Sequence, residues 1–255
     1  MTNISVQVFF VLIFQYVQTA VIQSRQNVSE GAARRTAHDP ARIRPMRIAD
    51  IEGCTIIPGR SIFRYRRKNT DDEVTDEASK SPKPECLILR PAAIMDGYID
   101  MAALESDPEF SPPDNGPFTQ AGDIIQETMT PFAAAYVGPG EEGVFVPNSC
   151  CVIRLQGKAL DLYDPLFIAG FLNLEQTNEA LRQRASGPRS ASLRKGTVGN
   201  IDLPDIPFST QQVIGKLVSA HIAQQKARHS LNQLEKELIL ASYATTQGNG
   251  EINAV

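Results

Sequence analysis

The sequence predicts an α+β protein in which a mixed α/β globular domain is followed by one long helix. Residues 46–207 are dominated by short apolar runs bounded by Gly and Pro, a pattern typical of strands joined by turns. From Ser209 to Tyr243 the chain contains one glycine, Gly215, and no proline. That contrast favours a single uninterrupted helix after the domain.

On this basis the chain divides into four segments. They are an N-terminal extension at 1–45, a globular domain at 46–207, a long helix at 208–245 and a flexible tail at 246–255. A chain of 255 residues is long enough for one domain with an appendage and a sizeable core.

The N-terminal extension opens with an uncharged run, Met1–Ser24, and becomes arginine-rich from Arg25 onward. The run approaches the ~20 residues of a membrane helix, and the arginines are similar to a positive-inside flank. It lacks the basic start and the cleavage site of a secretory signal. A membrane anchor and a translation start at Met46 are both open alternatives.

Within the domain, "MRIADIEGCTIIPG" at 46–59 alternates and meets a Pro-Gly turn, which predicts a strand and its exit. Residues 66–85 are charged and contain proline, so we expect an exposed loop. "CLILR" at 86–90 is a short strand, and "AAYVGPGEEGVFV" at 134–146 is a strand, turn and strand. Residues 164–185 have helical periodicity. The candidates for the buried face of that helix are Leu166, Ile168, Phe171, Leu172 and Leu181.

The long helix begins with Ser209 and Gln212 in the spacing of a capping box. Small and apolar positions then recur every four and three residues, with one polar member, Gln224. The predicted seam is Val213, Leu217, Ala220, Gln224, Ala227, Leu231, Leu234, Leu238 and Ala241. Such a narrow stripe is typical of a coiled coil, in which a buried polar residue fixes register. The helix would be about 50 Å long and could not bury its seam alone.

The net charge of −4 argues against a general polyanion binder. Basic residues nevertheless gather in two windows without acidic residues, Arg60–Lys68 and Arg182–Lys195. A local basic surface on an acidic protein follows from this distribution.

The chain offers little for catalysis or metal binding. It has no P-loop and no nucleophile elbow, and His221 and His229 are not at the i, i+4 spacing of helical metal pairs. The four cysteines have no C-x-x-C pair or disulfide framework spacing, which favours reduced thiols in a cytoplasmic protein. The sequence therefore predicts a chain that is not an enzyme by itself.

The order of the motifs resembles one family. "IADIEGCTIIPGRS", "ECLILRPAAIMDGYIDMAAL", "FTQAGDIIQETM", "GVFVPNSCCVIRL" and the run from Asp164 to Leu217 follow one another in that order. They resemble a target recognition domain and conserved helix of the specificity (S) subunit of type I restriction–modification systems. The resemblance covers about residues 46 to 245. One departure is Phe208, where the family usually has a second proline before the helix.

The resemblance implies a DNA-reading adaptor in which helices pair as an antiparallel coiled coil, set the distance between two half-sites and dock methyltransferase (M) and restriction (R) subunits. S-adenosylmethionine, ATP and Mg are then expected in those partner subunits, and no cofactor is expected in this chain. Only one recognition domain and one helix are present. The resemblance thus implies a half-subunit that pairs with a second copy or with another S chain.

Phosphate contacts are expected from the basic windows. The candidate residues are Arg60, Arg64, Arg66, Arg67, Lys68, Arg182, Arg184, Arg189, Arg194 and Lys195. The competing interpretation is a coiled-coil interaction protein, or an inactive remnant, that binds a protein partner without reading DNA.

Overall fold

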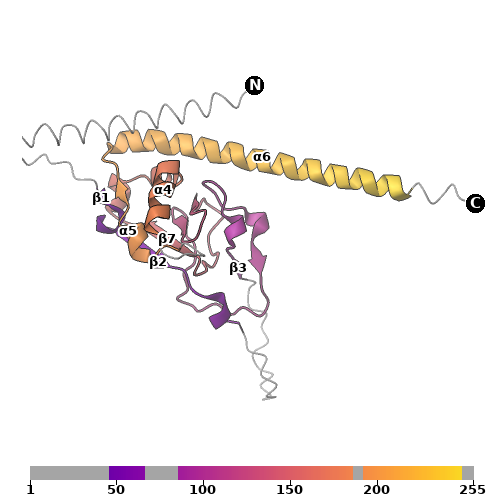
Figure 1. The fold of residues 1–255 in the computed structure, drawn as a ribbon, viewed down its shortest axis with the longest axis horizontal. Coiled ribbons are helices and arrows are strands. Elements are labelled where there is room, and N and C mark those ends of the chain that lie inside the picture. The colour runs from indigo at the N-terminus through magenta and orange to yellow at the C-terminus, as the bar shows by residue number, and fades with distance from the viewer. Residues whose placement is uncertain (1–45, 67–85, 186–191, 249–255) are drawn as a thin grey trace, which may run out of the picture.

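The computed structural model describes residues 46–66, 86–185 and 192–248 (Figure 1). The strands are β1 (Met46–Arg47), β2 (Cys54–Pro58), β3 (Leu87–Ile88), β4 (Glu105–Ser106), β5 (Ile124–Glu127), β6 (Ala134–Tyr136), β7 (Cys150–Leu155) and β8 (Asp202–Leu203). The helices are α2 (Ala159–Leu162), α3 (Pro165–Leu172), α4 (Glu175–Arg184), α5 (Lys195–Gly199) and α6 (Phe208–Gly248). Short 3-10 turns include η1 (Ile48–Asp50), η2 (Ile62–Arg64), η4 (Pro91–Ala93) and η5 (Met101–Ala103). The predicted α+β class, with a long C-terminal helix, is confirmed.

The centre of the domain is a four-stranded antiparallel sheet in the order β2-β7-β5-β6. Alternate residues of the central strands face two different apolar clusters: Ile153 enters one and Val152 the other. Because strand side chains alternate across the sheet, the apolar run at the end of "NSCCVIRL" supplies both clusters at once. The sheet is therefore covered on both faces.

One face of the sheet is covered by helices. Ile168 and Leu172 of α3, Leu181 of α4 and Val198 of α5 join the cluster that contains Ile153. The other face is covered by irregular chain around η4 and η5, including Ala93 and Ile99. The remaining strands form two small pairs, β1 with β8 and β3 with β4.

The periodic stretch 164–185, predicted as one helix, is two helices. Asp164 caps α3 by accepting hydrogen bonds from the backbone N–H groups of Leu166 and Phe167. After α3, the Asn173 side chain accepts from the Ala134 N–H at 2.8 Å and donates to the Ala134 carbonyl at 2.7 Å. These bonds fix the end of α3 to β6, and the chain restarts as α4 two residues later.

The predicted capping box is absent from the start of α6. The helix begins at Phe208, so Ser209 already lies inside it and is not the capping residue. The side chain of Gln211 takes part instead, donating to the carbonyls of Leu162 and Ile206 and accepting from the Asp164 N–H. The spacing of residues around the helix start could not predict these three contacts. They connect the start of α6 to the end of α2.

The first turns of α6 pack on the domain, and the rest of the helix extends past it (Figure 1). With 41 residues at 1.5 Å each, the helix is about 60 Å long. No helix within the described ranges combines the length and apolar character needed to cross a membrane. The apolar run at 1–24 and the doubtful start before Met46 lie outside the described residues.

Candidate nucleic-acid interface and helix seam

Backbone hydrogen bonds bring the start of the first basic window and the end of the second to one end of the sheet. Gly59, just after β2, donates to the carbonyl of Cys150 at 3.0 Å. The neighbouring Ser149 carbonyl accepts from the Thr128 N–H at 2.8 Å, and the Thr128 carbonyl accepts from the Leu193 N–H at 2.7 Å. With about 4.8 Å between hydrogen-bonded neighbours, the segments at 59–60 and 192–194 lie within about 15 Å of each other.

In the first basic window, three arginines are described. Arg60 donates to the Asn115 side chain at 3.1 Å, and Arg64 lies exposed on η2. Arg66 forms an ion pair with Asp107 at 2.8 Å. The predicted contacts Arg67 and Lys68 fall outside the described residues.

In the second window, Arg182 pairs with two carboxylates of its own helix, Glu175 at 2.9 Å and Glu179 at 3.3 Å. The window lacks acidic residues in sequence, but one helical turn and two turns earlier the same face of α4 supplies them. Arg184 donates to the carbonyl of Asn200 at 3.2 Å, and Arg194 is exposed.

Two further predicted contacts in this window are not placed in detail. Arg189 lies outside the described residues, and Lys195 begins α5 with a side chain that is not described. Among the described residues, four of the predicted arginines have no carboxylate partner. They are Arg60, Arg64, Arg184 and Arg194. No carboxylate of residues 46–66, 86–185 or 192–248 neutralises the charge of these four.

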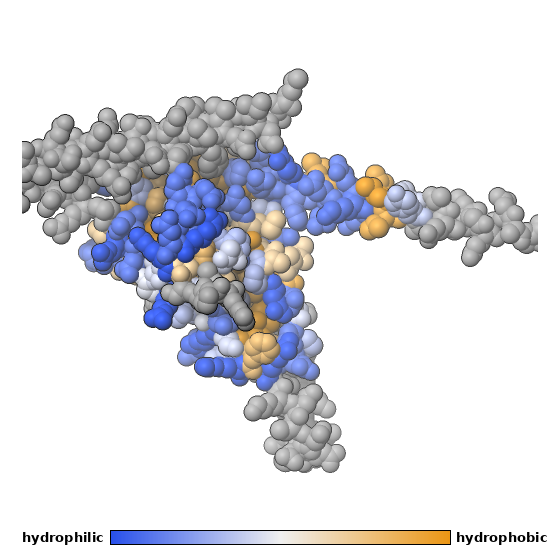
Figure 2. Space-filling view, viewed as in Figure 1, coloured by the Kyte–Doolittle hydropathy of each residue, from blue (hydrophilic) through white to orange (hydrophobic). Residues whose placement is uncertain are grey.

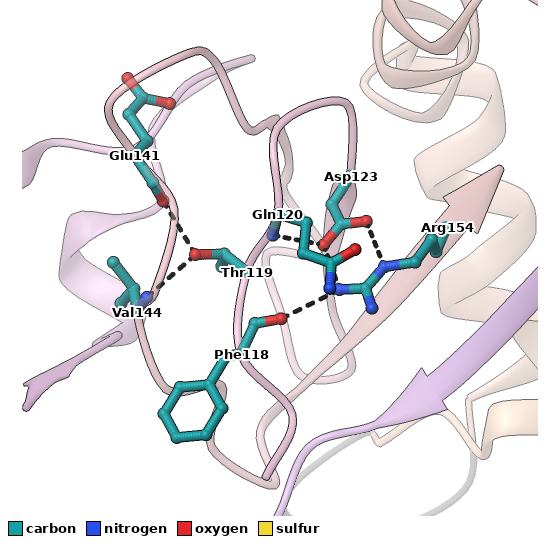
Figure 3. A network of polar contacts seen from close by, with 7 residues as sticks. All are labelled: Phe118, Thr119, Gln120, Asp123, Glu141, Val144 and Arg154. Carbon is teal, nitrogen blue, oxygen red and sulfur yellow. Dashed lines mark hydrogen bonds and ion pairs between the residues drawn. The ribbon is translucent and has the colours of Figure 1, made fainter. Parts of the chain in front are cut away.

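A polar network holds the loops at the opposite end of the sheet, where β5 begins and β7 ends (Figure 3). Asp123 is almost fully buried and accepts two hydrogen bonds from Arg154 of β7, at 2.8 Å from Nε and 2.7 Å from Nη2. The hydrogen bond to Asp123 raises the pKa of Arg154. Arg154 also donates to the carbonyl of Phe118 at 2.9 Å. This paired geometry is among the stronger ion-pair arrangements in proteins.

The same network orders the turn before β5. The second carboxylate oxygen of Asp123 accepts from the Gln120 N–H at 2.7 Å. Beside it, the Thr119 hydroxyl donates to the Glu141 carbonyl at 2.8 Å and accepts from the Val144 N–H at 3.0 Å. Gly122–Asp123 is therefore a structural turn. Sequence analysis gave no partner for Asp123, because Arg154 lies 31 residues away on another strand.

The described residues contain no group of three His, Cys, Asp or Glu side chains placed to hold a metal ion. Burial raises the pKa of the Cys150 thiol to about 12 and that of Cys54 to about 11. Both thiols are therefore protonated at neutral pH and poorly nucleophilic.

The predicted seam lies exposed along α6. All of its predicted members are exposed except Leu217, which is half-buried. The exposed fraction reaches 61% at Leu234 and 73% at Leu238. Figure 2 shows apolar side chains along the projecting end of the helix. The seam is not covered by the described part of the chain's own domain.

A second stripe, missed in the sequence, attaches α6 to the domain. Val218 and Ile222 are buried against Tyr98, with Ile214 partly buried beside them. The approach to α3 is close: a Cβ added at Gly170 would stand 2.6 Å from Val218. The spacing of 214, 218 and 222 was available in the sequence, but the stronger 4-3 pattern concealed it.

Two polar contacts extend this attachment along the helix. Lys226 lies 2.6 Å from the buried carboxylate of Glu141, with its ammonium over the Tyr98 ring at 5.4 Å from the centroid. Three residues later, His229 lies 3.2 Å from Asp100. Beyond His229, every described side chain from Ser230 to Tyr243 is exposed.

No family model and no curated protein matches this chain. Solved structures similar to it come from type I restriction–modification systems. One is a chain from a study of complex assembly and conformational transition of the type I R-M system, with 16% identity and a TM-score of 0.45, over 91% of this protein and 51% of that chain. Another is the HsdS subunit from Thermoanaerobacter tengcongensis, with 14% identity and a TM-score of 0.42, over 88% of this protein and 50% of that chain. The protein is similar to these two chains and spans about half the length of each.

Proposed function

We propose that this chain is a DNA-binding specificity subunit of a type I restriction–modification system, which reads one half of a split site. The proposal starts from the sequence resemblance. The observation that carries it further is the separation of two surfaces. Arg60, Arg64 and Arg194, none of them paired with a described carboxylate, belong to the segments that meet at one end of the sheet. The predicted seam is exposed on a helix that projects from the domain. A subunit that contacts DNA and also fixes the distance between two half-sites needs both surfaces.

Most of the seam points away from the attachment to the domain, and Leu217 is its one half-buried member. At about 100° per residue, Leu231 of the seam and Val218 of the attached face are about 140° apart around the helix. A partner helix can therefore lie on the seam without displacing the domain. Because a single exposed seam of this kind is stable only when it is paired, we propose a second helix as its occupant.

An antiparallel pairing of two copies gives well-matched layers. In the register we propose, the numbers of two facing residues add up to 451. This register places each large side chain opposite either another apolar side chain of similar size or a small one. The layers of one copy against the other are Val213 with Leu238, Leu217 with Leu234, Ala220 with Leu231 and Gln224 with Ala227. The two Gln224 side chains then lie near the two-fold axis, close enough to satisfy each other.

This register sets a distance. Phe208 of one copy lies level with Tyr243 of the other, so the two helix starts are about 50 Å apart along the axis. At 3.4 Å per base pair this equals about 15 base pairs, more than one turn of duplex. In this proposal the homodimer binds a DNA site with two-fold symmetry, in which two half-sites flank a spacer that the protein does not contact.

The chemistry of the complex would reside elsewhere. Methyl transfer from S-adenosylmethionine and ATP-driven steps with Mg belong, in this proposal, to methyltransferase and restriction subunits that dock on this chain. The chain itself would supply the reading domain and the spacing helix. Its localisation would be cytoplasmic, where those subunits and the DNA are found.

DNA reading is tested by salt-dependent binding. The full chain, with its methyltransferase partner where one is obtained, is incubated with a randomised duplex pool, and a preferred site is selected. Changing Arg60, Arg64, Arg184 or Arg194 singly to Gln should each reduce the slope of log affinity against log salt by about 1. The matched control is Lys236→Gln on the exposed part of α6, which should leave the slope unchanged. Equal slopes for all five variants would refute the interface.

Antiparallel pairing is tested by cysteine cross-linking in a background with Cys54 and Cys86 changed to Ser. A chain with both Ala220→Cys and Leu231→Cys should form an intermolecular disulfide on oxidation. In the antiparallel arrangement, position 220 of one copy lies far from position 220 of the other. The single variant Ala220→Cys should therefore give no cross-link. Efficient cross-linking of the single variant would indicate a parallel pair and contradict the register.

The exposed seam also favours the alternative function, a coiled-coil interaction protein that binds a protein partner without reading DNA. Selection from the randomised pool separates the two. Enrichment of a defined sequence supports the specificity subunit. A stable helix-mediated complex with no sequence enrichment supports the alternative, and would fit an inactive remnant as well.

A further inference from the structure

Phe63 is the most exposed large apolar side chain among the described residues, at 82% of its surface. The other aromatic rings of this region are packed together instead. Tyr65, Phe110, Phe118 and Phe145 pack edge-to-face in one cluster, with ring centroids 4.8 to 6.5 Å apart. The turn that carries Phe63 thus buries the aromatic ring two residues later and leaves this one in solvent.

The backbone at Phe63 is held from both sides. Its neighbour Ile62 and the nearby Tyr65 pack on the aromatic cluster, and the Tyr65 N–H donates to the Ile62 carbonyl at 3.0 Å. The Tyr65 carbonyl accepts from the Ser111 N–H at 3.0 Å. An exposed ring on an anchored turn loses little entropy on binding, which is the property of a preorganised contact.

Three arginines lie within three residues of Phe63 along the chain, and one of them, Arg66, is paired with Asp107. Arg64 is adjacent in sequence, Arg60 lies three residues before, and the Arg66 guanidinium stands over the ring at 5.8 Å from its centroid. A protein-binding surface would be expected to present a contiguous apolar patch. A single aromatic ring among arginines instead fits a polyanion that also offers an apolar group.

Phe63 also lies close to the end of the sheet where segments of the two basic windows meet. Phe63 lies on η2, four residues after Gly59, whose N–H bonds to Cys150. In Figure 1 this turn lies beyond the end of β2, on the side of the domain away from α6. Phe63 can therefore enter a groove of a duplex whose phosphates contact the neighbouring arginines.

We propose that Phe63 is a specificity-determining residue that reads a thymine through its 5-methyl group in the major groove. The inference rests on the proposed function and deepens it. Apolar contact between a Phe ring and the thymine methyl is a form of direct readout. Because Arg66 covers one face of the ring, a methyl group against the open face suits the geometry better than insertion between stacked bases.

The test uses the site selected by the wild-type full chain from a randomised duplex pool. Each thymine of that site is replaced in turn by uracil, which lacks only the methyl group. For the wild type, one replacement should weaken binding by about three- to tenfold. Phe63→Ala should bind the thymine site correspondingly more weakly and should no longer distinguish thymine from uracil there. Phe63→Leu, which keeps an apolar side chain, should retain part of the discrimination.

The outcomes separate this inference from the proposed function. If the wild type selects no sequence, the proposed function fails and the inference fails with it. If the wild type selects a site but Phe63→Ala selects the same site with equal affinity and an equal uracil effect, only the role of Phe63 is refuted. A selected site in which no thymine is sensitive to methyl removal also overturns it. The salt slope of Phe63→Ala should match that of the wild type, because no phosphate contact is lost.

Discussion

The two halves of α6 belong to one continuous helix but have different surroundings. In the proximal half, Phe208–His229, Val218 and Ile222 are buried against the domain. In the distal half, described side chains from Ser230 to Tyr243 are all exposed, including three leucines of the seam. The proximal half also carries its part of the predicted seam, about 100–180° around the helix from Val218. The helix is therefore fixed to its domain by one stripe, and the predicted seam is exposed along another.

This difference assigns separate tasks to the two stripes. The domain-facing stripe at 214, 218 and 222 contributes to the folding stability of one chain. In the proposed pairing, the seam contributes to stability only through a second helix, since the hydrophobic gain requires removal of its side chains from water. Substitutions in the two stripes should therefore affect different measurements.

The largest expected effect comes from truncating a domain-facing side chain. Ile222→Ala should lower the free energy of unfolding by about 2–4 kcal/mol, because it removes buried methyl groups and leaves a cavity beside Tyr98. Leu234→Ala, its matched control in the seam, should change that value by less than about 0.5 kcal/mol in the monomer. Urea unfolding in dilute solution, with sedimentation to verify the monomer, measures both. Equal losses would show that the two stripes are not distinct.

The close contact between α3 and α6 provides the next test. Gly170→Ala should destabilise the chain by about 1–3 kcal/mol, because the new Cβ would stand 2.6 Å from a methyl group of Val218. Adding Val218→Ala should recover part of the loss, since the smaller side chain makes room. A double-mutant cycle of unfolding free energies measures this coupling. Strict additivity would mean that the two helices do not touch there.

Much of this organisation was accessible from the sequence, for a physical reason. The α+β class followed from turn residues and apolar runs, and the seam followed from a strict 4-3 spacing in which Leu231, Leu234 and Leu238 recur. Both signals are local or periodic, so neighbouring residues suffice to carry them. The residues predicted to form the seam lie exposed on α6 except for the half-buried Leu217, and their pairing with a second helix stays a prediction.

Features that depend on distant contacts were not accessible. The break after α3 is set by Asn173 bonding to Ala134, and the start of α6 is set by Gln211 and not by the Ser209 box. Arg182 belonged to a window without acidic residues, yet it pairs with carboxylates that precede the window on the same helix face. Phe63 gave no sequence signal, because its exposure depends on how its neighbours pack.

A smaller effect is expected from the ion pair at the end of the attachment. Lys226→Ala should cost about 1 kcal/mol, because the buried Glu141 carboxylate loses its cation while Lys226 itself is partly solvated. Lys236→Ala, in the exposed distal half, should leave the unfolding free energy unchanged within about 0.5 kcal/mol. Thermal unfolding at low and high salt measures both variants. The Lys226 effect should decrease at high salt, and a loss of equal size at both salt concentrations would argue against an electrostatic origin.

Removing the distal half should have the smallest effect on the fold and a complete effect on assembly. A chain that ends at His229 keeps every described contact between α6 and the domain, including the pair with Asp100. Its unfolding free energy in dilute solution should therefore stay within about 0.5 kcal/mol of the full chain. The deletion removes Leu231, Leu234 and Leu238, and with them one member of three of the four matched layers, so concentration-dependent association in sedimentation should be lost. A truncated chain that still associates would place the interface on the domain and not on the helix. A truncated chain that is unfolded would show that the residues after His229 stabilise the domain.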